Sequence, residues 1–321
     1  MRIRIAALAA FATLACNAAA QAPYPDKTVR IIVPYPAAGT SDILARVVAP
    51  HLQKKLGQPF IVDNRGGASG AIGTVAVAKS PADGHTLLLG TINTHGINSA
   101  LQKNLAYDAV KDFAPVTVIA YTPNVLSVHP SLPAKNLAEL LALVRANPGK
   151  YSFGSTSIAG SPHMSGELLK AMAKVDIQHV PYKGAGPMLN DLIGGQIPMG
   201  FDNLPSSINF IKSGRIRAIA LTTLKRWPGT PDIPTMAESG LPGYEVSGWF
   251  GLLAPAGTPR AVVDLLHRTA AEIVKQPDVS KQLFDLGSEP GGNAPEAFAR
   301  DIVADVEKWR KVAAQTGVKA E

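Results

Sequence analysis

Short runs of strand-forming residues alternate with stretches in which apolar positions have helical spacing. Residues 28–33 are rich in β-branched side chains and end at a proline, which predicts a strand. Residues 41–56 place apolar side chains three and four positions apart, which predicts an amphipathic helix. Strands are expected next at 60–63 and 86–90, with a helix of small residues over 70–79 between them. This order favours an α/β fold with parallel strands.

The middle of the chain repeats the alternation, and its end is helical. Helices are expected at 136–147, 161–173, 188–193, 260–275, 279–285 and 295–316, and strands at 151–154, 177–181, 197–201, 216–221 and 249–253. Two long stretches without helical spacing, 113–129 and 241–255, hold strand-forming residues around polar or Gly/Pro breaks. We interpret them as two crossings between two lobes.

Two crossings make the first lobe discontinuous. The prediction is a first lobe of residues 23–122 plus 247–321 and a second lobe of residues 123–246. A ligand is then expected to bind between the lobes, with a hinge that closes over it.

The N-terminus has the order of a secretory signal peptide. Arg2 and Arg4 precede an apolar run at 5–14, and two Ala-x-Ala cleavage patterns follow. The apolar run is about half of the roughly 20 residues that a membrane span needs. We therefore expect residues 1–22 to be removed on export to the periplasm. The only cysteine, Cys16, lies inside this segment, and its lipidation is the alternative.

The charge distribution narrows the classes of partner. The formal net charge is +7, from 31 Lys and Arg against 24 Asp and Glu, and the basic residues form no run longer than two. Nucleic-acid binding proteins usually carry a clustered basic stripe, so no nucleic-acid partner is expected. A mildly basic surface suits an anionic ligand.

The most informative loop, Pro-Tyr-Pro-Ala-Ala-Gly-Thr-Ser-Asp, links the first strand to the first helix. The small residues Ala37, Ala38 and Gly39 allow a ligand to approach the backbone. Thr40 or Ser41 is the expected N-cap. Free N–H groups at the positive end of the helix would then form an anion site without an arginine. A merely capped helix behind a tight turn is the alternative.

Asp42 has two interpretations. Arg46 follows four residues later, so an ion pair aided by the helix dipole is the structural one. A contact to the ligand or to a bound water is the functional one.

A second loop, 154–163, has the same construction in the other lobe. It is rich in Gly and hydroxyls, and Pro162 suits the first helical position, which makes Ser161 the expected cap. Thr91 and Thr94 follow the strand at 86–90, at a carboxyl strand end where α/β sites gather. Two loops of this kind, one in each lobe, predict a site that grips a carboxylate from both sides.

Sequence motifs give little support to an enzyme. The chain lacks the Gly-x-Ser-x-Gly, Walker and His-Glu-x-x-His patterns. His163 and Glu167 share a helix face but lack a nearby third ligand, so no metal and no cofactor are expected. A secreted α/β hydrolase or lyase, with Ser, His and Asp brought together from distant loops, stays open as an alternative.

The chain resembles the Bug-type solute-binding proteins of tripartite tricarboxylate transporters. The matching segments are 34–42, 67–73, 83–88, 154–163, 180–184, 201–202 and 249–259. Several long motifs in the same order, over nearly the whole chain after the signal segment, make the resemblance specific.

The resemblance implies a Venus flytrap fold of the periplasmic binding proteins and a carboxylate held by N–H groups, hydroxyls and waters. Carried over to this sequence, it implies ligand contacts from Ala37, Ala38, Gly39, Thr40, Asp42, Ser155, Ser157, Ser161 and Asp202. The family usually has two glycines where this chain has Ala38-Gly39, so the methyl group of Ala38 can narrow the cleft. Lys183 is either a ligand contact or a surface residue on a turn.

The implied function is delivery of a small carboxylate, such as an organic acid, a dicarboxylate or an amino acid, to the membrane permease of such a transporter by a monomeric protein. A sensor that docks on a signalling receptor is a further alternative.

Overall fold

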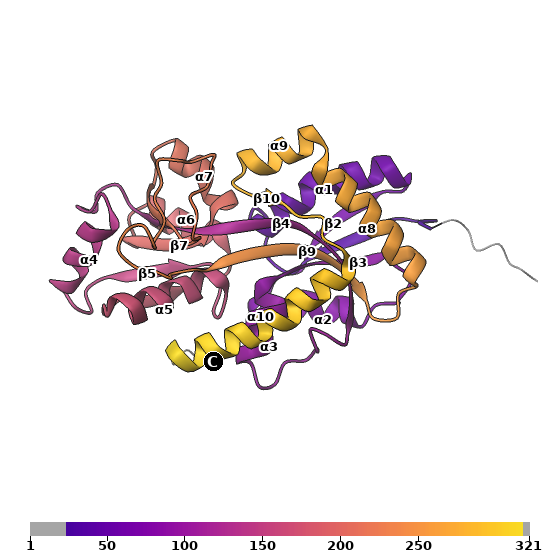
Figure 1. Ribbon diagram of the computed structural model, residues 1–321, viewed down its shortest axis with the longest axis horizontal. Helices are drawn as coiled ribbons and strands as arrows, with labels where there is room; N and C mark the ends of the chain where they lie inside the picture. The colour runs from indigo at the N-terminus through magenta and orange to yellow at the C-terminus, as the bar shows by residue number, and fades with distance from the viewer. Residues whose placement is uncertain (1–23, 317–321) are drawn as a thin grey trace, which may run out of the picture.

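The computed structural model describes residues 24–316. The expected signal peptide and Cys16 lie outside the described residues. Among residues 24–316, no helix combines the length and the apolar character that crossing a membrane requires. The described chain forms two lobes side by side, and long strands run from one to the other (Figure 1).

The sheet of the first lobe has a parallel half and an antiparallel half. β1 pairs in parallel with β2 and β3, whereas β9 pairs antiparallel with β3 and β4, and β10 pairs antiparallel with β4. The strands, in sheet order, are β2 (Phe60–Asn64), β1 (Val29–Val33), β3 (Thr86–Thr91), β9 (Ser247–Pro255), β4 (Phe113–Val128) and β10 (Glu289–Pro290).

The sheet of the second lobe has the same division. β5 pairs in parallel with β6 and β7, and β4 pairs antiparallel with β7 and β8. Its strands are β6 (Gln178–Pro181), β5 (Ser152–Ser155), β7 (Met199–Asn203), the second half of β4, and β8 (Arg217–Leu221).

Both expected crossings are present, and one is a single strand. β4 is 16 residues long; its first part pairs with β9, and residues from Asn124 onward pair with β7. The chain returns where the Val246 N–H donates to Thr222 O in the second lobe and Ser247 pairs with Pro123 at the start of β9. The two-lobed α/β fold is therefore confirmed, with antiparallel crossing strands joining sheets that are otherwise largely parallel.

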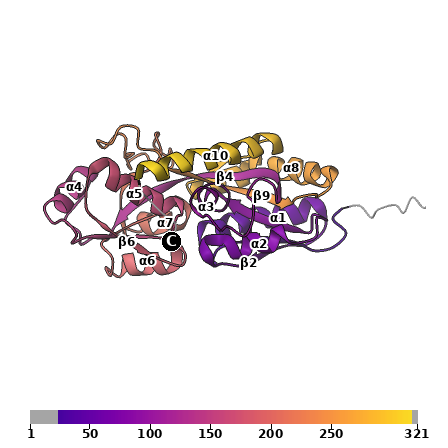
Figure 2. The same ribbon diagram turned by 90° about the horizontal axis from the view of Figure 1, so that it is seen from below.

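Helices cover both sheets. Those of the first lobe are α1 (Thr40–Leu56), α2 (Ala71–Ala78) after a short turn η1 (Ala68–Gly70), the turn η2 (Asn93–Ile97) with α3 (Asn98–Leu101), α8 (Arg260–Lys275), α9 (Pro277–Asp285) and α10 (Pro295–Thr316). Those of the second lobe are α4 (Leu137–Arg145), α5 (Ser161–Ala173), α6 (Ala185–Ile193) and α7 (Leu204–Lys212). Seen from below, α10 lies along β4 toward the second lobe (Figure 2).

Apolar side chains bury one face of each amphipathic helix. Leu44, Val48 and Leu52 of α1 and Leu266 and Ile273 of α8 are almost fully buried in one core against the first sheet. This packing fixes α1 against the first sheet, with its N-terminus next to α7 of the second lobe.

Candidate functional site

A small cavity lies between the lobes, and we call it the inner chamber. Its volume is about 40 Å³. Since one water needs roughly 10–15 Å³ on this measure, the chamber holds about three water-sized groups, which is the size of one carboxylate. It is lined by Tyr35, Pro36, Gly39, Thr40, Ser41, Thr91, Ile92, Asn93, Thr156, Ser161, Gly184, Ala185, Asp202, Asn203, Gly248 and Phe250.

A larger opening, the outer cleft, adjoins the inner chamber and has a volume of about 1240 Å³. Tyr35, Pro36, Thr156 and Gly184 line both spaces. The backbone of Gly184 lies close to Pro36, because a Cβ atom there would be 3.3 Å from the proline Cγ. The boundary between chamber and cleft is therefore narrow and made by both lobes.

The first-lobe loop leaves the N-terminus of α1 uncapped. The N-cap is Gly39, in an extended conformation (φ −83°, ψ 168°), and no side chain caps the helix. The expectation of Thr40 or Ser41 as the cap is thus wrong by one or two residues, because both already lie in the first turn. With no side-chain cap, the first N–H groups of the helix remain available where Thr40 and Ser41 line the inner chamber.

The second-lobe loop repeats this arrangement. The N-cap of α5 is Gly160, again extended and without a capping side chain, so the expected cap Ser161 is the first helical residue instead. The Ser161 N–H donates to the side-chain oxygen of Asn93, 2.8 Å away in the first lobe. Asn93 therefore accepts the hydrogen bond that a ligand carboxylate would take in the chamber. α6 also begins at the chamber, with the uncapped Gly184 as its N-cap.

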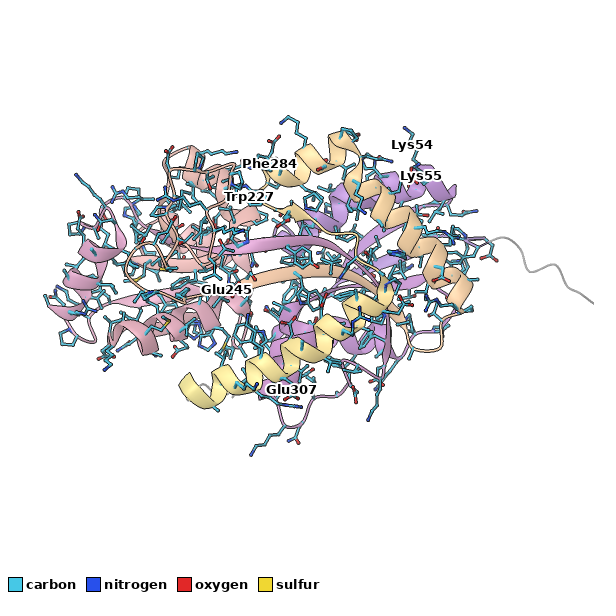
Figure 3. All side chains as sticks on the ribbon, in the orientation of Figure 1. Lys54, Lys55, Trp227, Glu245, Phe284 and Glu307 are labelled. Carbon is cyan, nitrogen blue, oxygen red and sulfur yellow. The ribbon has the colours of Figure 1, made fainter. Side chains whose placement is uncertain are left out.

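Direct hydrogen bonds join the lobes beside the chamber. The Thr40 hydroxyl lies 3.1 Å from the Ser206 hydroxyl of α7. Ser206 in turn donates to Asp202 Oδ2 at 2.6 Å, so its oxygen is free to accept from Thr40. The rings of Trp227, in the second lobe, and Phe284, in α9 of the first lobe, also meet, with centroids 5.0 Å apart (Figure 3). The described structure is therefore a closed form.

Asp202 is a buried carboxyl without a cationic partner among the described residues. Burial raises its pKa to about 6, although hydrogen bonds from Ser206, Ser207 and the Asn203 N–H partly offset this effect. These three donors belong to the start of α7. Asp202 thus organises the N-terminus of that helix while it lines the chamber.

The sequence-predicted residues Ala37, Ala38 and Asp42 line neither space. Ala37 and Ala38 are exposed, and the Ala38 N–H donates to Asp42 Oδ2 at 2.9 Å. The other oxygen of Asp42 accepts from Arg46 Nε, also at 2.9 Å. Burial opposes ionisation of Asp42, but these donors outweigh it and hold its pKa below the usual range. In this closed form, Asp42 therefore has the structural role that the sequence offered as one alternative, an ion pair with Arg46.

Of the remaining sequence-predicted residues, some line one of the two spaces and others do not. Thr91 lines the inner chamber and lies 3.1 Å from the Tyr35 hydroxyl, whereas Thr94 turns away and bonds to the Thr91 carbonyl and to His95. Ser157 lines the outer cleft, and its buried hydroxyl has no partner within the described chain.

Ser155 and His179 form a Ser–His pair, the arrangement that an enzyme hypothesis requires. The Ser155 Oγ lies 2.7 Å from His179 Nε2. However, Ser155 is fully buried, lines neither space, and donates to the Ser157 carbonyl. Burial also lowers the pKa of His179 to about 3, so the ring is a weak base. The pair therefore helps to hold the second-lobe loop 154–163 in its conformation.

His163 belongs to the same support. It accepts from the Ala159 N–H at 2.9 Å and stacks on His179 with centroids 3.8 Å apart. Its partner on the helix face, Glu167, is engaged by Lys170 at 2.9 Å. No group of three or more His, Cys, Asp or Glu within residues 24–316 is placed to hold a metal ion.

Two site residues have no local sequence signal: Asn203 lies at a strand end and Gly248 on a crossing strand. Asn93 lies between Thr91 and Thr94, in the segment after the strand at 86–91 where the sequence does predict a site. The hydroxyl of Thr122, on β4, is buried without a hydrogen-bond partner among residues 24–316 and faces Gly248. They meet only because the two crossing strands lie side by side.

Comparison with known proteins gives consistent matches. The family model described as "Tripartite tricarboxylate transporter family receptor" matches residues 44–318. Protein BugT of Bordetella pertussis is 36% identical over 92% of this chain and 91% of its own length. The structure of R. palustris Rpa4515 with adipate has a TM-score of 0.90 at 42% identity, and covers 92% of this chain and 99% of that one. MatC from Rhodopseudomonas palustris with bound malate has a TM-score of 0.85 at 34% identity, over 90% and 99% of the two chains.

Proposed function

Because the chain belongs to the family of tripartite tricarboxylate transporter receptors, we propose that it captures a small carboxylate in the inner chamber and passes it to the permease of such a transporter. One observation carries the proposal: uncapped helix N-termini from both lobes, those of α1 and α5, meet at a cavity of carboxylate size. Relatives whose structures hold adipate and malate support it.

The chemistry of the chamber favours a carboxylate over a cation or a neutral solute. Backbone N–H groups at a helix N-terminus carry partial positive charge and point at the ligand. The Ser161 N–H and the Thr40 hydroxyl come from opposite lobes. A carboxylate with two oxygens can accept from both lobes at once, replacing the amide oxygen of Asn93.

Closure follows from this division of donors. Each lobe alone offers only part of the set, so the ligand binds the closed form more tightly and shifts the population toward it. We place the lobe boundaries within β4 near residues 122–123 and at the start of β9 near residues 246–247, where the pairing partners change.

The proposed function also includes a location, the periplasm, and a partner, the permease. The export segment at 1–22 directs the chain to the periplasm, where a monomer meets its permease. No reaction is assigned to the site, since the Ser155–His179 pair faces neither space and its histidine is a weak base. In the alternative role of a sensor, the signalling receptor would bind the same closed form of the protein.

A thermal-shift screen of organic acids tests the binding step. A ligand at 100 times its Kd stabilises the folded protein by about 2.7 kcal/mol. We expect at least one carboxylate to raise the melting temperature, its amide analogue to have no effect, and the acid to be recovered unchanged by mass spectrometry. Turnover of the acid, or a response to amides only, would refute the proposal.

A further inference from the structure

The two crossings are joined at one residue of the second lobe, Thr222. Its N–H donates to the Asn124 carbonyl of β4 at 3.0 Å, and its carbonyl accepts from the Val246 N–H at 2.9 Å. Its hydroxyl accepts from the Asn124 N–H at 2.9 Å and donates to the Val246 carbonyl. Since Thr222 is fully buried, water does not compete for these bonds. Both crossing strands are therefore anchored to the second lobe at the point where they leave it.

The side chain of Asn124 extends this anchor toward the inner chamber. Asn124 and Asn203 are register partners on β4 and β7, so their side chains leave the sheet on the same face. Asn124 Oδ1 accepts from Asn203 Nδ2 and, at 3.4 Å, from the Ser161 hydroxyl. Asn203 and Ser161 line the inner chamber, whereas Asn124 is fully buried and is not among the residues that line the chamber or the outer cleft. Asn124 therefore acts on the chamber only through these two side chains.

The orientation of the Asn124 amide is fixed from its other end. Its Nδ2 donates to Ser165 Oγ at 3.0 Å, and the Ser165 hydroxyl in turn donates to the Ser161 carbonyl at 2.9 Å. Because a serine hydroxyl has a single hydrogen, Ser165 can only accept from Asn124, and the amide keeps its oxygen toward Asn203. All of these groups belong to the second lobe, so we expect the network to remain intact when the lobes part.

The two side chains that Asn124 holds converge on one place in the chamber. A Cβ atom on Gly248 would lie 3.6 Å from Asn203 Nδ2 and 3.7 Å from Ser161 Oγ. Within residues 24–316, neither side chain makes another hydrogen bond, so both can rotate once the Asn124 oxygen is removed. Each side chain that a bound ligand must order by itself costs roughly two- to tenfold in affinity.

We propose that Asn124 is a positioning residue: in the open and the closed form alike, it holds Asn203 and Ser161 in the orientation that binding requires, and Thr222 ties that orientation to the hinge. This inference rests on the proposed function, and it concerns the support of the chamber rather than a contact with the ligand. The role of Asn124 is preorganisation, because donors that are ordered before the ligand arrives do not have to be ordered by binding.

The variant Asn124→Leu removes the amide and keeps a side chain of similar size. NMR relaxation of side-chain amides, without ligand, measures whether Asn203 is ordered, and its signal is identified by its loss in Asn203→Ala. We expect an ordered Asn203 amide in the wild-type protein and a mobile one in Asn124→Leu. Asn124→Ser, whose side chain ends before the position of the amide oxygen, replaces the leucine variant if that variant does not fold.

Isothermal titration with adipate and malate as probes measures the consequence for binding. Asn124→Leu should lower the affinity about tenfold in the wild-type background but only about two- to threefold in Asn203→Ala, because part of its effect passes through Asn203. A merely structural role would give the same factor in both backgrounds. Asn136→Ala is the control: it removes the side chain that caps α4 in the same lobe, so the melting temperature should fall while the affinity stays unchanged.

The outcomes separate the two proposals. An Asn203 amide that is mobile in the wild-type protein or stays ordered in Asn124→Leu, or an affinity loss of equal size in both backgrounds, would overturn this inference and leave the proposed function standing. If no acid of the thermal-shift screen binds the wild-type protein, the proposed function fails, and the order of the Asn203 amide still decides whether Asn124 positions it.

Discussion

Gly248→Ala is the most direct perturbation of the inner chamber. Gly248 lies on the crossing strand β9 and lines the chamber. A Cβ atom there would meet Thr122 Oγ1 at 3.5 Å, Asn203 Nδ2 at 3.6 Å and Ser161 Oγ at 3.7 Å. These are ordinary van der Waals distances, so the alanine fits without moving the backbone. All three neighbours are polar atoms, so the methyl group enters the space that a carboxylate needs.

The expected magnitude follows from the size of the chamber. A volume of about 40 Å³ holds about three water-sized groups, and the methyl group takes the place of one of them. One carboxylate oxygen then loses its position, and a hydrogen bond to a charged group contributes about 1.5–3 kcal/mol. Since every 1.4 kcal/mol is a factor of ten, carboxylate affinity should fall roughly 10- to 100-fold.

Isothermal titration measures the affinity, and thermal denaturation without ligand measures the stability. Gly186→Ala is the control: a Cβ atom at Gly186, in α6, would meet nothing within 4 Å. It should leave the affinity unchanged and raise the stability of its helix slightly. Unchanged affinity in Gly248→Ala, with an unchanged melting temperature, would mean that the carboxylate does not reach β9 and that the chamber is misassigned.

Three further perturbations test other parts of the argument. Ala38→Gly should raise the free energy of unfolding by about 0.5–1 kcal/mol in a urea titration, because Ala38 has a left-handed φ of +65° and the gain from relieving it exceeds the entropic cost of glycine. The pKa of Asp202 in the folded protein, about 6, exceeds its ordinary value of 3.8, so the contribution of this group to stability is full below pH 4, and roughly 3 kcal/mol is lost as pH rises through 6; Asp202→Asn should flatten that part of the profile. Trp227→Ala should weaken carboxylate binding about 2- to 10-fold through loss of the ring contact with Phe284 between the lobes, and a double-mutant cycle with Phe284→Ala should recover the coupling.

The sequence predicts most of the fold because its helices are amphipathic and its strands apolar. The helices α5 and α8 have the expected bounds, since their buried positions follow helical spacing. The helix α7 was missed because its first turn contains Pro205, Ser206 and Ser207, which look like a loop until Asp202 is placed beside them. The 16 residues of β4 look like two strands because prolines interrupt them.

The site was predictable only at the level of loops. Gly, Ser and Pro before a helix are local signals, so the sequence predicts both loops that line the inner chamber. The cap positions were wrong because a glycine at the N-cap makes no side-chain bond, whereas sequence preference assigns that position to a hydroxyl. Asn203 and Gly248 carry no signal of their own, since their roles depend on the crossing strands, whereas Asn93 follows β3 in a segment that the sequence does single out.

A receptor must release its ligand as well as bind it, and the inner chamber has the composition for both. A buried Lys or Arg would bind a carboxylate strongly, and it would remain a desolvated charge when the carboxylate departs. Neutral donors avoid that cost, because water can satisfy each N–H and hydroxyl as soon as the lobes part. The donors are also divided between Thr40 in one lobe and Ser161 in the other. Opening is therefore expected to separate the donors of the two lobes in one step, so that a partner which opens the lobes lowers the affinity without touching the ligand.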